Sequence, residues 1–384
     1  MKSSSGAHYI ALDHVRALAA FMVGTWHFIH SFGVAGPVPL EYTPALFPLA
    51  LLDEGHTGVS LFMALSGYLF AKLLDGKTIN YAAFIWNRVL RLFPLLLIVI
   101  LIVGVKKFQA GESISSYAYL IARGILFPTL PNGGWSITVE VHYYLILPLF
   151  LWMLKKSRFL PLTILVAAFV LRWFIYHVQG EIQSLAYWTI VGRIDQFAIG
   201  MLVFQFRSYF VRRHVLAITI LTGFTIFFWY FDLRGGFYFG PSYPSPRPIW
   251  LFLMTIEGIV YAIGIAWYES SFSHSTTGVS KLIGRMGEWS YSFYLLHRFT
   301  TPESVKFIHE RIMDLSNFYL SCAWSAILFL LTMPVMYLSF RFIEMPFLKL
   351  RKHYIVATHK KLETSSQTIQ PGSSAETLKQ AAEL

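Results

Sequence analysis

The chain has 384 residues, of which 55% are hydrophobic and 13% charged, and its mean hydropathy of +0.54 lies far above that of a soluble domain. The net charge of +11 does not indicate a nucleic-acid ligand, because most basic residues flank apolar segments, where they orient a membrane protein. The single cysteine, Cys322, excludes an intramolecular disulfide and a cysteine-rich metal site. These features predict an all-α, polytopic transmembrane helical bundle.

About ten apolar segments have the length needed to span a bilayer. They cover residues 9–31, 57–75, 89–105, 137–154, 159–178, 185–206, 214–231, 249–268, 287–308 and 318–342. An eleventh segment, 117–130, is short and ends in the breaker run PTLPNGG, which is typical of an interfacial or re-entrant piece. With ten spans, the richest basic clusters fall on the side of the N-terminus, so both termini are expected in the cytoplasm.

The predicted spans form one transmembrane domain over residues 1–350. No connection is long enough to bury a core of its own. Residues 351–384 are polar and rich in Ser, Thr and Gln, which predicts a disordered cytoplasmic tail. The first apolar segment is longer than a signal-peptide core and is interrupted by charges, so we expect it to remain as the first span.

The first span, residues 9–31, carries Asp13, Arg16 and His27. Charge inside such a segment is costly and is usually functional. Eleven residues separate Arg16 from His27, which places the two side chains on the same helix face about 16 Å apart along the axis. Alternatively, Asp13 and Arg16 neutralise each other one turn apart, and His27 is a hydrogen-bonded interior histidine.

The second and third spans add small and basic residues. Ser66 lies in the run LFMALSGYLF, where small residues indicate either close helix packing or a substrate contact. Arg88 and Arg91, in RVLRLFP, are neighbours on one helix face. They are either ordinary cytoplasmic anchors or a bidentate clamp for phosphates.

Two later segments carry polar side chains at helical spacing. The run GGWSITVEVHYY contains Trp135 and Glu140, and a solvated face does not explain a carboxylate in that apolar neighbourhood. The run GEWSYSFYLLH contains Tyr291 and His297. His297 either binds a substrate or bonds another helix.

Taken together and in this order, the motifs resemble the integral-membrane acyltransferase family 3. This family includes O-acetyltransferases of bacterial surface polysaccharides, Nod-factor acetylases and macrolide acyltransferases. The resemblance covers residues 9 to about 350. It rests on the spacing of Arg16 and His27 and on LFMALSGYLF, RVLRLFP, WSITVE, GRIDQFAIGML, SYSFYLLH and IEMP. His142 follows WSITVEV where an acidic or amide residue is more usual, so its role is open.

The resemblance implies transfer of an acyl group, most often acetyl, from cytoplasmic acyl-CoA to a hydroxyl of an extracytoplasmic or membrane-associated glycan, such as a polysaccharide or lipopolysaccharide. The expected location is the bacterial inner membrane, among its lipids. Arg16, Arg88 and Arg91 would bind the phosphates of CoA. His27 would act as general base or carry the acyl group itself, and both routes stay open. Glu140 would orient the acceptor or set the tautomer of His27.

The tetrahedral intermediate of such a transfer needs hydrogen-bond donors for its oxyanion. The candidates are Ser66, Trp135, Tyr291 and His297. The sequence shows no metal-ligand spacing, so we expect no metal cofactor. The competing hypothesis is a transporter or flippase of a lipid-linked saccharide, in which the buried charges line a pathway. The cytoplasmic arginines Arg16, Arg88 and Arg91 are positioned for a nucleotide donor, which favours the acyltransferase over the transporter.

Overall fold

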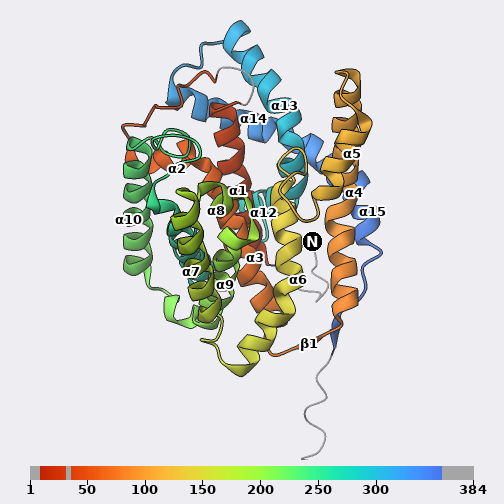
Figure 1. The fold of residues 1–384 in the computed structure, drawn as a ribbon, viewed down its shortest axis with the longest axis vertical. Coiled ribbons are helices and arrows are strands. Elements are labelled where there is room, and N and C mark those ends of the chain that lie inside the picture. The colour runs from red at the N-terminus through yellow and green to blue at the C-terminus, as the bar shows by residue number, and fades with distance from the viewer. Residues whose placement is uncertain (1–8, 32–35, 357–384) are drawn as a thin grey trace, which may run out of the picture.

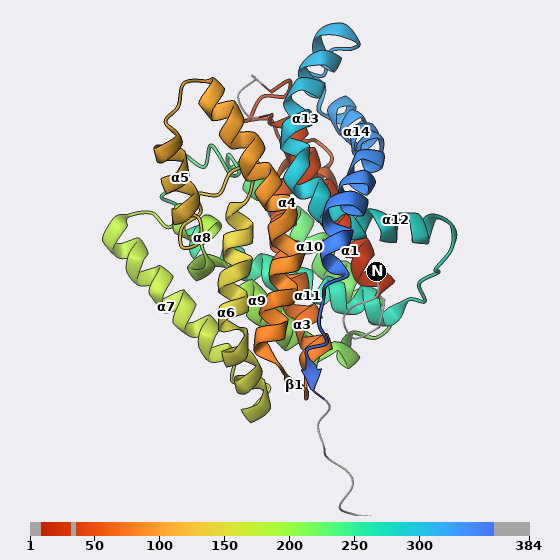
Figure 2. The same ribbon diagram turned by 90° about the vertical axis from the view of Figure 1, so that its right-hand side faces the viewer.

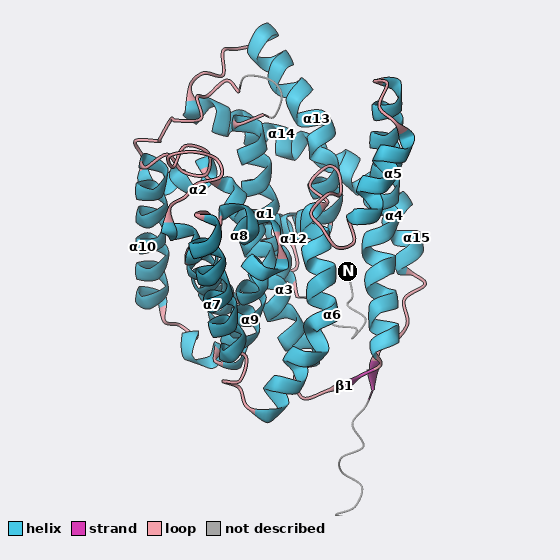
Figure 3. Cartoon of the chain, viewed as in Figure 1, coloured by secondary structure: helices cyan, strands magenta, loops and turns pink. Residues whose placement is uncertain are grey.

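The computed structural model describes residues 9–31 and 36–356. The described residues are almost entirely helical, as Figures 1 and 3 show. Within them the single sheet is an antiparallel pair of two-residue strands, β1 (Thr78–Ile79) and β2 (Ile355–Val356). The predicted all-α class is therefore confirmed. Residues 351–356 belong to the folded body, and the rest of the predicted tail lies outside the described residues.

The helices follow the apolar segments of the sequence. The longer ones are α1 (Ile10–Ile29), α3 (Gly58–Leu74), α4 (Tyr81–Gln109), α5 (Ile114–Arg123), α6 (Trp135–Lys156), α7 (Leu162–Gln179), α9 (Ile190–Gln205), α10 (His214–Leu233), α11 (Leu253–Ser271), α12 (Gly278–Glu288), α13 (Ser290–Arg311) and α14 (Phe318–Ser339). Short helices are α2 (Ala50–Asp53), α8 (Gln183–Trp188) and α15 (Met345–Leu348). Single turns are η1 (Phe47–Leu49), η2 (Gly55–Thr57), η3 (Arg207–Phe210), η4 (Pro248–Leu251) and the π-helical η5 (Phe340–Glu344).

Six helices of the described chain are long and apolar enough to cross a membrane. They cover Gly55–Leu74, Tyr81–Gln109, Trp135–Lys156, Leu162–Gln179, His214–Leu233 and Phe318–Leu348. The expected number of ten spans is not confirmed. The other four expected spans correspond to α1, α9, α11 and α13. Charged residues lower the hydropathy of α1, α11 and α13, and α9 has only 16 residues.

The segment 117–130 does not form a spanning helix. Its helix, α5, has 10 residues and so is about 15 Å long, half the thickness of a bilayer core. It packs against the end of α4, as Figure 2 shows. This agrees with the expected interfacial or re-entrant piece.

The most buried helices lie inside the bundle, and the helices that expose most of their apolar surface lie outside. Figure 1 shows α1 and α3 at the centre, with α10 and α4 at opposite edges. The charged side chains Arg193, Asp195 and Glu257 of α9 and α11 are fully buried. Partners from other helices neutralise them: Asp195 accepts a hydrogen bond from Arg172 at 2.9 Å. A lipid-facing helix needs an apolar surface, whereas an interior helix can hold paired charges. A hydropathy criterion therefore detects a lipid-facing spanning helix more readily than an interior one.

Glycines set the close packing of α3 against α9. A Cβ at Gly67 would lie 2.1 Å from the carbonyl oxygen of Phe197, and one at Gly200 would lie 2.2 Å from that of Ala64. Small residues let two helix backbones approach in this way, which membrane helices use in place of a hydrophobic driving force. The two adjacent small residues of LFMALSGYLF therefore have different roles: Gly67 allows close packing of α3 against α9, and Ser66 lines a cavity.

Candidate functional site

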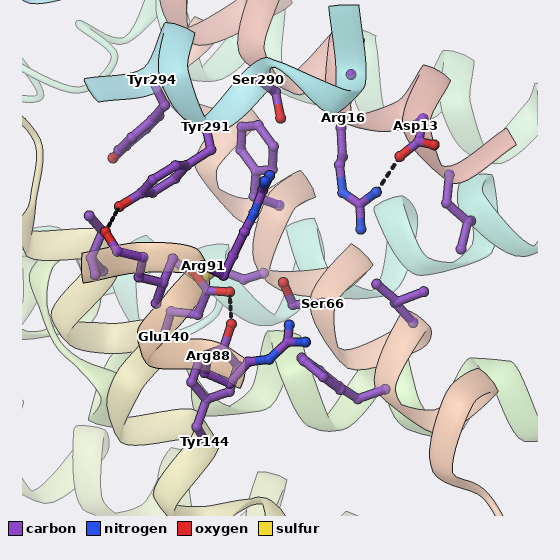
Figure 4. Close-up of a pocket in the computed structure, with 18 of the residues that line it drawn as sticks. Asp13, Arg16, Ser66, Arg88, Arg91, Glu140, Tyr144, Ser290, Tyr291 and Tyr294 are labelled. Carbon is purple, nitrogen blue, oxygen red and sulfur yellow. Dashed lines mark hydrogen bonds and ion pairs between the residues drawn. The ribbon is translucent and has the colours of Figure 1, made fainter. Parts of the chain in front are cut away.

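A cavity of about 230 Å³ opens between α1, α3, α4, α6 and α13. Four arginines line it, namely Arg16, Arg88, Arg91 and Arg351, and we call it the cationic cavity. Figure 4 shows Arg16 of α1 and Arg88 and Arg91 of α4 reaching toward the same space. The structure therefore brings together the three arginines predicted to bind phosphates.

Two of these arginines are held by carboxylates. Arg16 donates to Asp13 one turn earlier on α1, as the local alternative predicts, yet its side chain still lines the cavity. Arg91 donates to Glu344 at 2.8 Å, across 253 residues of sequence. Glu344 is completely buried, so its charge fixes one face of the Arg91 guanidinium. The arginines are thus oriented in advance of any ligand.

Arg88 is enclosed by aromatic rings. Its guanidinium lies 5.4 Å from the ring centres of Phe70 and Phe84 and 5.9 Å from that of Tyr144. Tyr144 in turn donates its hydroxyl hydrogen bond to Glu140, as Figure 4 shows. Glu140 accordingly lines the cationic cavity, whereas His27 lines a different one.

Arg351 is a cavity residue that sequence reasoning placed in the disordered tail. Asn87 on α4 fixes the backbone there: its Nδ2 donates to the Lys352 carbonyl at 2.7 Å, and the Lys352 N–H donates to its Oδ1 at 2.9 Å. Burial, together with the charges of Arg88 and Arg91, lowers the pKa of Arg351 to about 9. A site that crowds like charges in this way favours an anionic ligand.

A second, smaller cavity of about 40 Å³ lies beyond the first. Its walls include three histidines, His27, His56 and His297, so we call it the histidine cavity. Aromatic and basic side chains complete the lining: Trp26, Trp135, Tyr187, Trp188, Tyr294 and Arg298. Val59 and Tyr294 line both cavities and therefore stand between them.

Helix α1 runs past both cavities. Arg16 lines the cationic cavity and His27 the histidine cavity, in keeping with their predicted placement along one helix face. Their axial separation is about 16 Å. One helix thus places the Arg16 guanidinium in the cationic cavity and the His27 imidazole in the adjoining histidine cavity.

Backbone carbonyls fix the orientation of the His27 and His297 rings. His27 Nδ1 lies 2.9 Å from the Val23 carbonyl oxygen, and His297 Nδ1 lies 2.9 Å from that of Phe293. A carbonyl only accepts, so in the neutral rings both Nδ1 atoms carry the proton. His297 Nε2 then accepts from His27 Nδ1, at 3.3 Å. This arrangement leaves the lone pair of His27 on Nε2, the state that a general base requires.

The four predicted oxyanion donors fall into two groups. Ser66 and Tyr291 line the cationic cavity, and the Tyr291 hydroxyl donates to the carbonyl of Leu92. Trp135 and His297 line the histidine cavity beside His27. The structure therefore brings only the second group to the predicted base.

Three cavity residues, Tyr294, Arg351 and His56, escaped the sequence reasoning. Tyr294 is one residue among many aromatics in its helix, and nothing in the sequence singles it out. His56 had a signal: it follows Asp53 and Glu54 immediately before a span, in a connection that lacks basic residues. Across the described ranges, no group of three His, Cys, Asp or Glu side chains is placed to hold a metal ion.

A family profile described as an acyltransferase domain matches residues 9–344. The chain belongs to acyltransferase family 3. The predicted resemblance is thus confirmed over nearly the whole folded body.

Relatives of this family member share its sequence at low identity. It is 23% identical to the peptidoglycan O-acetyltransferase OatA of Listeria monocytogenes, over 88% of this chain and 56% of the relative. It is also 23% identical to a Staphylococcus aureus (strain COL) protein that carries the provisional name of an O-acetyltransferase, over 78% of this chain and 53% of the relative. The chain spans about half the length of the curated relatives it matches. No solved structure matches it.

Proposed function

We propose that this protein is an integral-membrane O-acyltransferase that moves an acyl group, acetyl in the first instance, from acyl-CoA to a hydroxyl of a carbohydrate. One observation carries the proposal: a cationic cavity and a histidine cavity adjoin along α1, with Val59 and Tyr294 between them. Transfer from a phosphorylated donor to a neutral acceptor needs two such sites. Membership of acyltransferase family 3 supports the reaction class.

The cationic cavity is suited to the donor. The phosphates of CoA need fixed cations, and Arg16, Arg88, Arg91 and Arg351 line this one space. Glu140 acts here through charge, since Arg88 and Arg91 are its nearest cationic neighbours. In this arrangement Glu140 positions the arginines. The pantetheine arm then reaches toward Tyr294 and His27.

His27 carries out the proton transfer. The acceptor oxygen attacks the thioester carbonyl carbon, and its proton passes to His27 Nε2 as the C–O bond forms. Collapse of the tetrahedral intermediate breaks the C–S bond, and the CoA sulfur leaves with the proton. Trp135, whose indole N–H is a hydrogen-bond donor, lines the cavity where the oxyanion develops. His297 lines the same cavity but has both ring nitrogens engaged, by the Phe293 carbonyl and by His27, so it acts on the base and not on the oxyanion. A general base in this position contributes about 10²- to 10⁴-fold in rate. In the alternative route, His27 Nε2 attacks first and carries the acetyl group to the acceptor.

The acceptor is proposed to be a glycan on the outer side of a bacterial inner membrane. The named activity of the Listeria relative, O-acetylation of peptidoglycan, supports a carbohydrate. Acyl-CoA is made in the cytoplasm, so the cationic cavity would open there. Both termini would then lie in the cytoplasm, as the distribution of basic residues favours.

The test compares wild type with Arg16→Ala and His27→Ala, in detergent, for acetyl-CoA binding and release of free CoA thiol. We expect Arg16→Ala to weaken donor binding, because it removes a phosphate contact. His27→Ala should bind the donor normally and lose turnover. If wild-type protein does not bind acetyl-CoA, the acyltransferase proposal is refuted, and transport of a lipid-linked saccharide becomes the better explanation of the buried charges.

A further inference from the structure

A carboxylate holds the third histidine of the histidine cavity. His56 Nε2 lies 2.8 Å from Glu54 Oε2, and the other carboxylate oxygen, Oε1, accepts the backbone N–H of Phe237 at 3.0 Å. Glu54 is 5% exposed and His56 1%. Glu54 directly follows α2, and His56 lies in η2 at the start of the apolar helix Gly55–Leu74.

These contacts decide which nitrogen of His56 is available. Glu54 Oε1 accepts from Phe237, and an ionised carboxylate can only accept at Oε2 as well, so we assign the proton of this pair to His56 Nε2. The lone pair then lies on Nδ1. That buried atom has no hydrogen-bond partner among the described residues. A buried acceptor without a partner is costly and is typical of a site that a ligand completes.

His56 and His27 line the same cavity. The ring of Trp26 lies edge-on to both, with ring centres 4.7 Å from His27 and 5.7 Å from His56. A volume of about 40 Å³ holds a few water-sized groups. It therefore admits a hydroxyl and the carbon that bears it, and leaves the rest of a sugar ring outside.

The connection between α10 and η4 closes over this pair. A Cβ at Gly236 would lie 1.6 Å from Glu54 Oε1, and its φ of +52° also favours glycine, so this glycine lets the backbone reach the carboxylate. Two residues on, Tyr238 stacks on Trp26 with ring centres 5.9 Å apart and planes 4° apart. Trp26 covers one face of this half-buried ring, so a sugar ring has only the opposite face of Tyr238 on which to stack.

We propose that His56 Nδ1 binds the acceptor hydroxyl, that Glu54 positions the His56 ring for this purpose, and that the ring of a carbohydrate acceptor lies toward Tyr238. The inference rests on the proposed function and assigns its acceptor site. His56 accepts the hydrogen bond of the hydroxyl and thereby turns the oxygen lone pair toward the donor carbonyl. A hydroxyl has one proton, so this binding mode belongs to the route in which His27 Nε2 carries the acyl group. The hydroxyl oxygen forms the bond to the acyl carbon, the bond from that carbon to His27 Nε2 breaks, and His56 Nδ1 takes the proton.

The experiment measures CoA thiol release from acetyl-CoA with water and with ethylene glycol as hydroxyl probes. His56→Phe keeps a flat ring but removes both nitrogens, whereas His56→Asn places an amide oxygen near the position of Nδ1. We expect His56→Phe to lower kcat/KM for ethylene glycol about 10- to 100-fold and His56→Asn to recover part of that loss. Both variants should keep the thermal stabilisation by CoA. His142→Phe, at a half-buried histidine of α6 that lines neither cavity, is the matched control.

The role of Glu54 is tested by coupling. Glu54→Gln still accepts from Phe237 but presents an NH₂ group to His56, which forces the proton onto Nδ1 and blocks it as an acceptor. The double variant, Glu54→Gln with His56→Phe, should therefore have the same kcat/KM for ethylene glycol as His56→Phe alone. If Glu54 were purely structural, the double variant would lose more activity than His56→Phe. If His56→Phe is not stabilised by CoA, His56→Leu takes its place in the same comparison.

The outcomes separate the two proposals. Turnover of His56→Phe within about two-fold of wild type, or equal rates for His56→Phe and His56→Asn at a reduced level, overturns the acceptor site while the proposed function stands. A wild-type protein that releases no CoA thiol with either probe refutes the proposed function, and the acceptor site falls with it.

Discussion

Replacing Arg351 with glutamine should stabilise the free protein and weaken donor binding at once. Arg351 is half-buried beside Arg88 and Arg91, and its pKa of about 9 lies well below the ordinary value of an arginine. The pKa of Arg351 is lower in the folded protein than in the unfolded chain, which means that folding disfavours the charged guanidinium. At neutral pH the side chain is charged, so its charge lowers the free energy of unfolding. Arg351→Gln removes that cost, and the melting temperature of the free protein should rise by a degree or two.

The loss in binding follows from the phosphate contact. A charge-assisted hydrogen bond contributes about 1.5–3 kcal/mol, so the Kd for CoA should increase about 10- to 100-fold. At a CoA concentration of about 100 times the wild-type Kd, ligand stabilises wild type by about 2.7 kcal/mol. A variant that binds about 30-fold more weakly gains only about 0.9 kcal/mol under the same conditions. The ligand-induced shift should therefore fall to about a third.

The assay is thermal unfolding in detergent with and without CoA, over a series of CoA concentrations. Lys349→Gln is the matched control, because it makes the same charge change two residues earlier at an exposed position. A CoA-induced shift in Arg351→Gln equal to that of wild type would show that the segment after α15 does not contact the donor. A fall in the free-protein melting temperature would refute the argument from charge crowding.

Two further variants test the packing and the base. Gly67→Ala would press a Cβ against the Phe197 carbonyl and should lower the free energy of unfolding by about 1–3 kcal/mol or more. The control Gly223→Ala, where an added Cβ has no heavy atom within 4 Å, should be neutral or stabilising. Equal melting temperatures for the two variants would contradict the assigned helix contact. His297→Phe removes the hydrogen bond to His27 and should lower kcat about ten-fold or more, shift the pH profile of kcat, and leave CoA affinity unchanged. An unchanged pH profile would make His297 a packing residue only.

Features that depend on one helix were predictable. The placement of Arg16 and His27 on one helix, serving adjoining cavities, follows from their spacing and the helix repeat. The joint approach of Arg88 and Arg91 to one cavity follows from their i, i+3 spacing on α4. Local periodicity fixes the side of the helix that a residue occupies.

Features that depend on contacts between distant segments were not predictable. Nothing in the local pattern pairs Arg91 with Glu344, 253 residues away, or pins Lys352 against Asn87. Residues 351–356, the first part of the predicted tail, are held for the same reason by contacts with α4 and β1 that their own sequence does not indicate. The number of spans is not confirmed by length and hydropathy alone, because charged residues such as Asp13 and Arg16 lower the hydropathy of an interior helix such as α1.

The thin partition formed by Val59 and Tyr294 has a consequence for the membrane itself. On the proposed function, the two cavities open to opposite faces, and an unbroken water-filled passage between them would let ions leak and dissipate the gradients that the cell maintains. A barrier one side chain thick avoids this leak, yet a two-carbon acetyl group on a slender arm is small enough to pass beside it. The same two side chains would then limit the size of the group exported, so that a longer acyl chain is rejected by the seal that keeps the membrane tight.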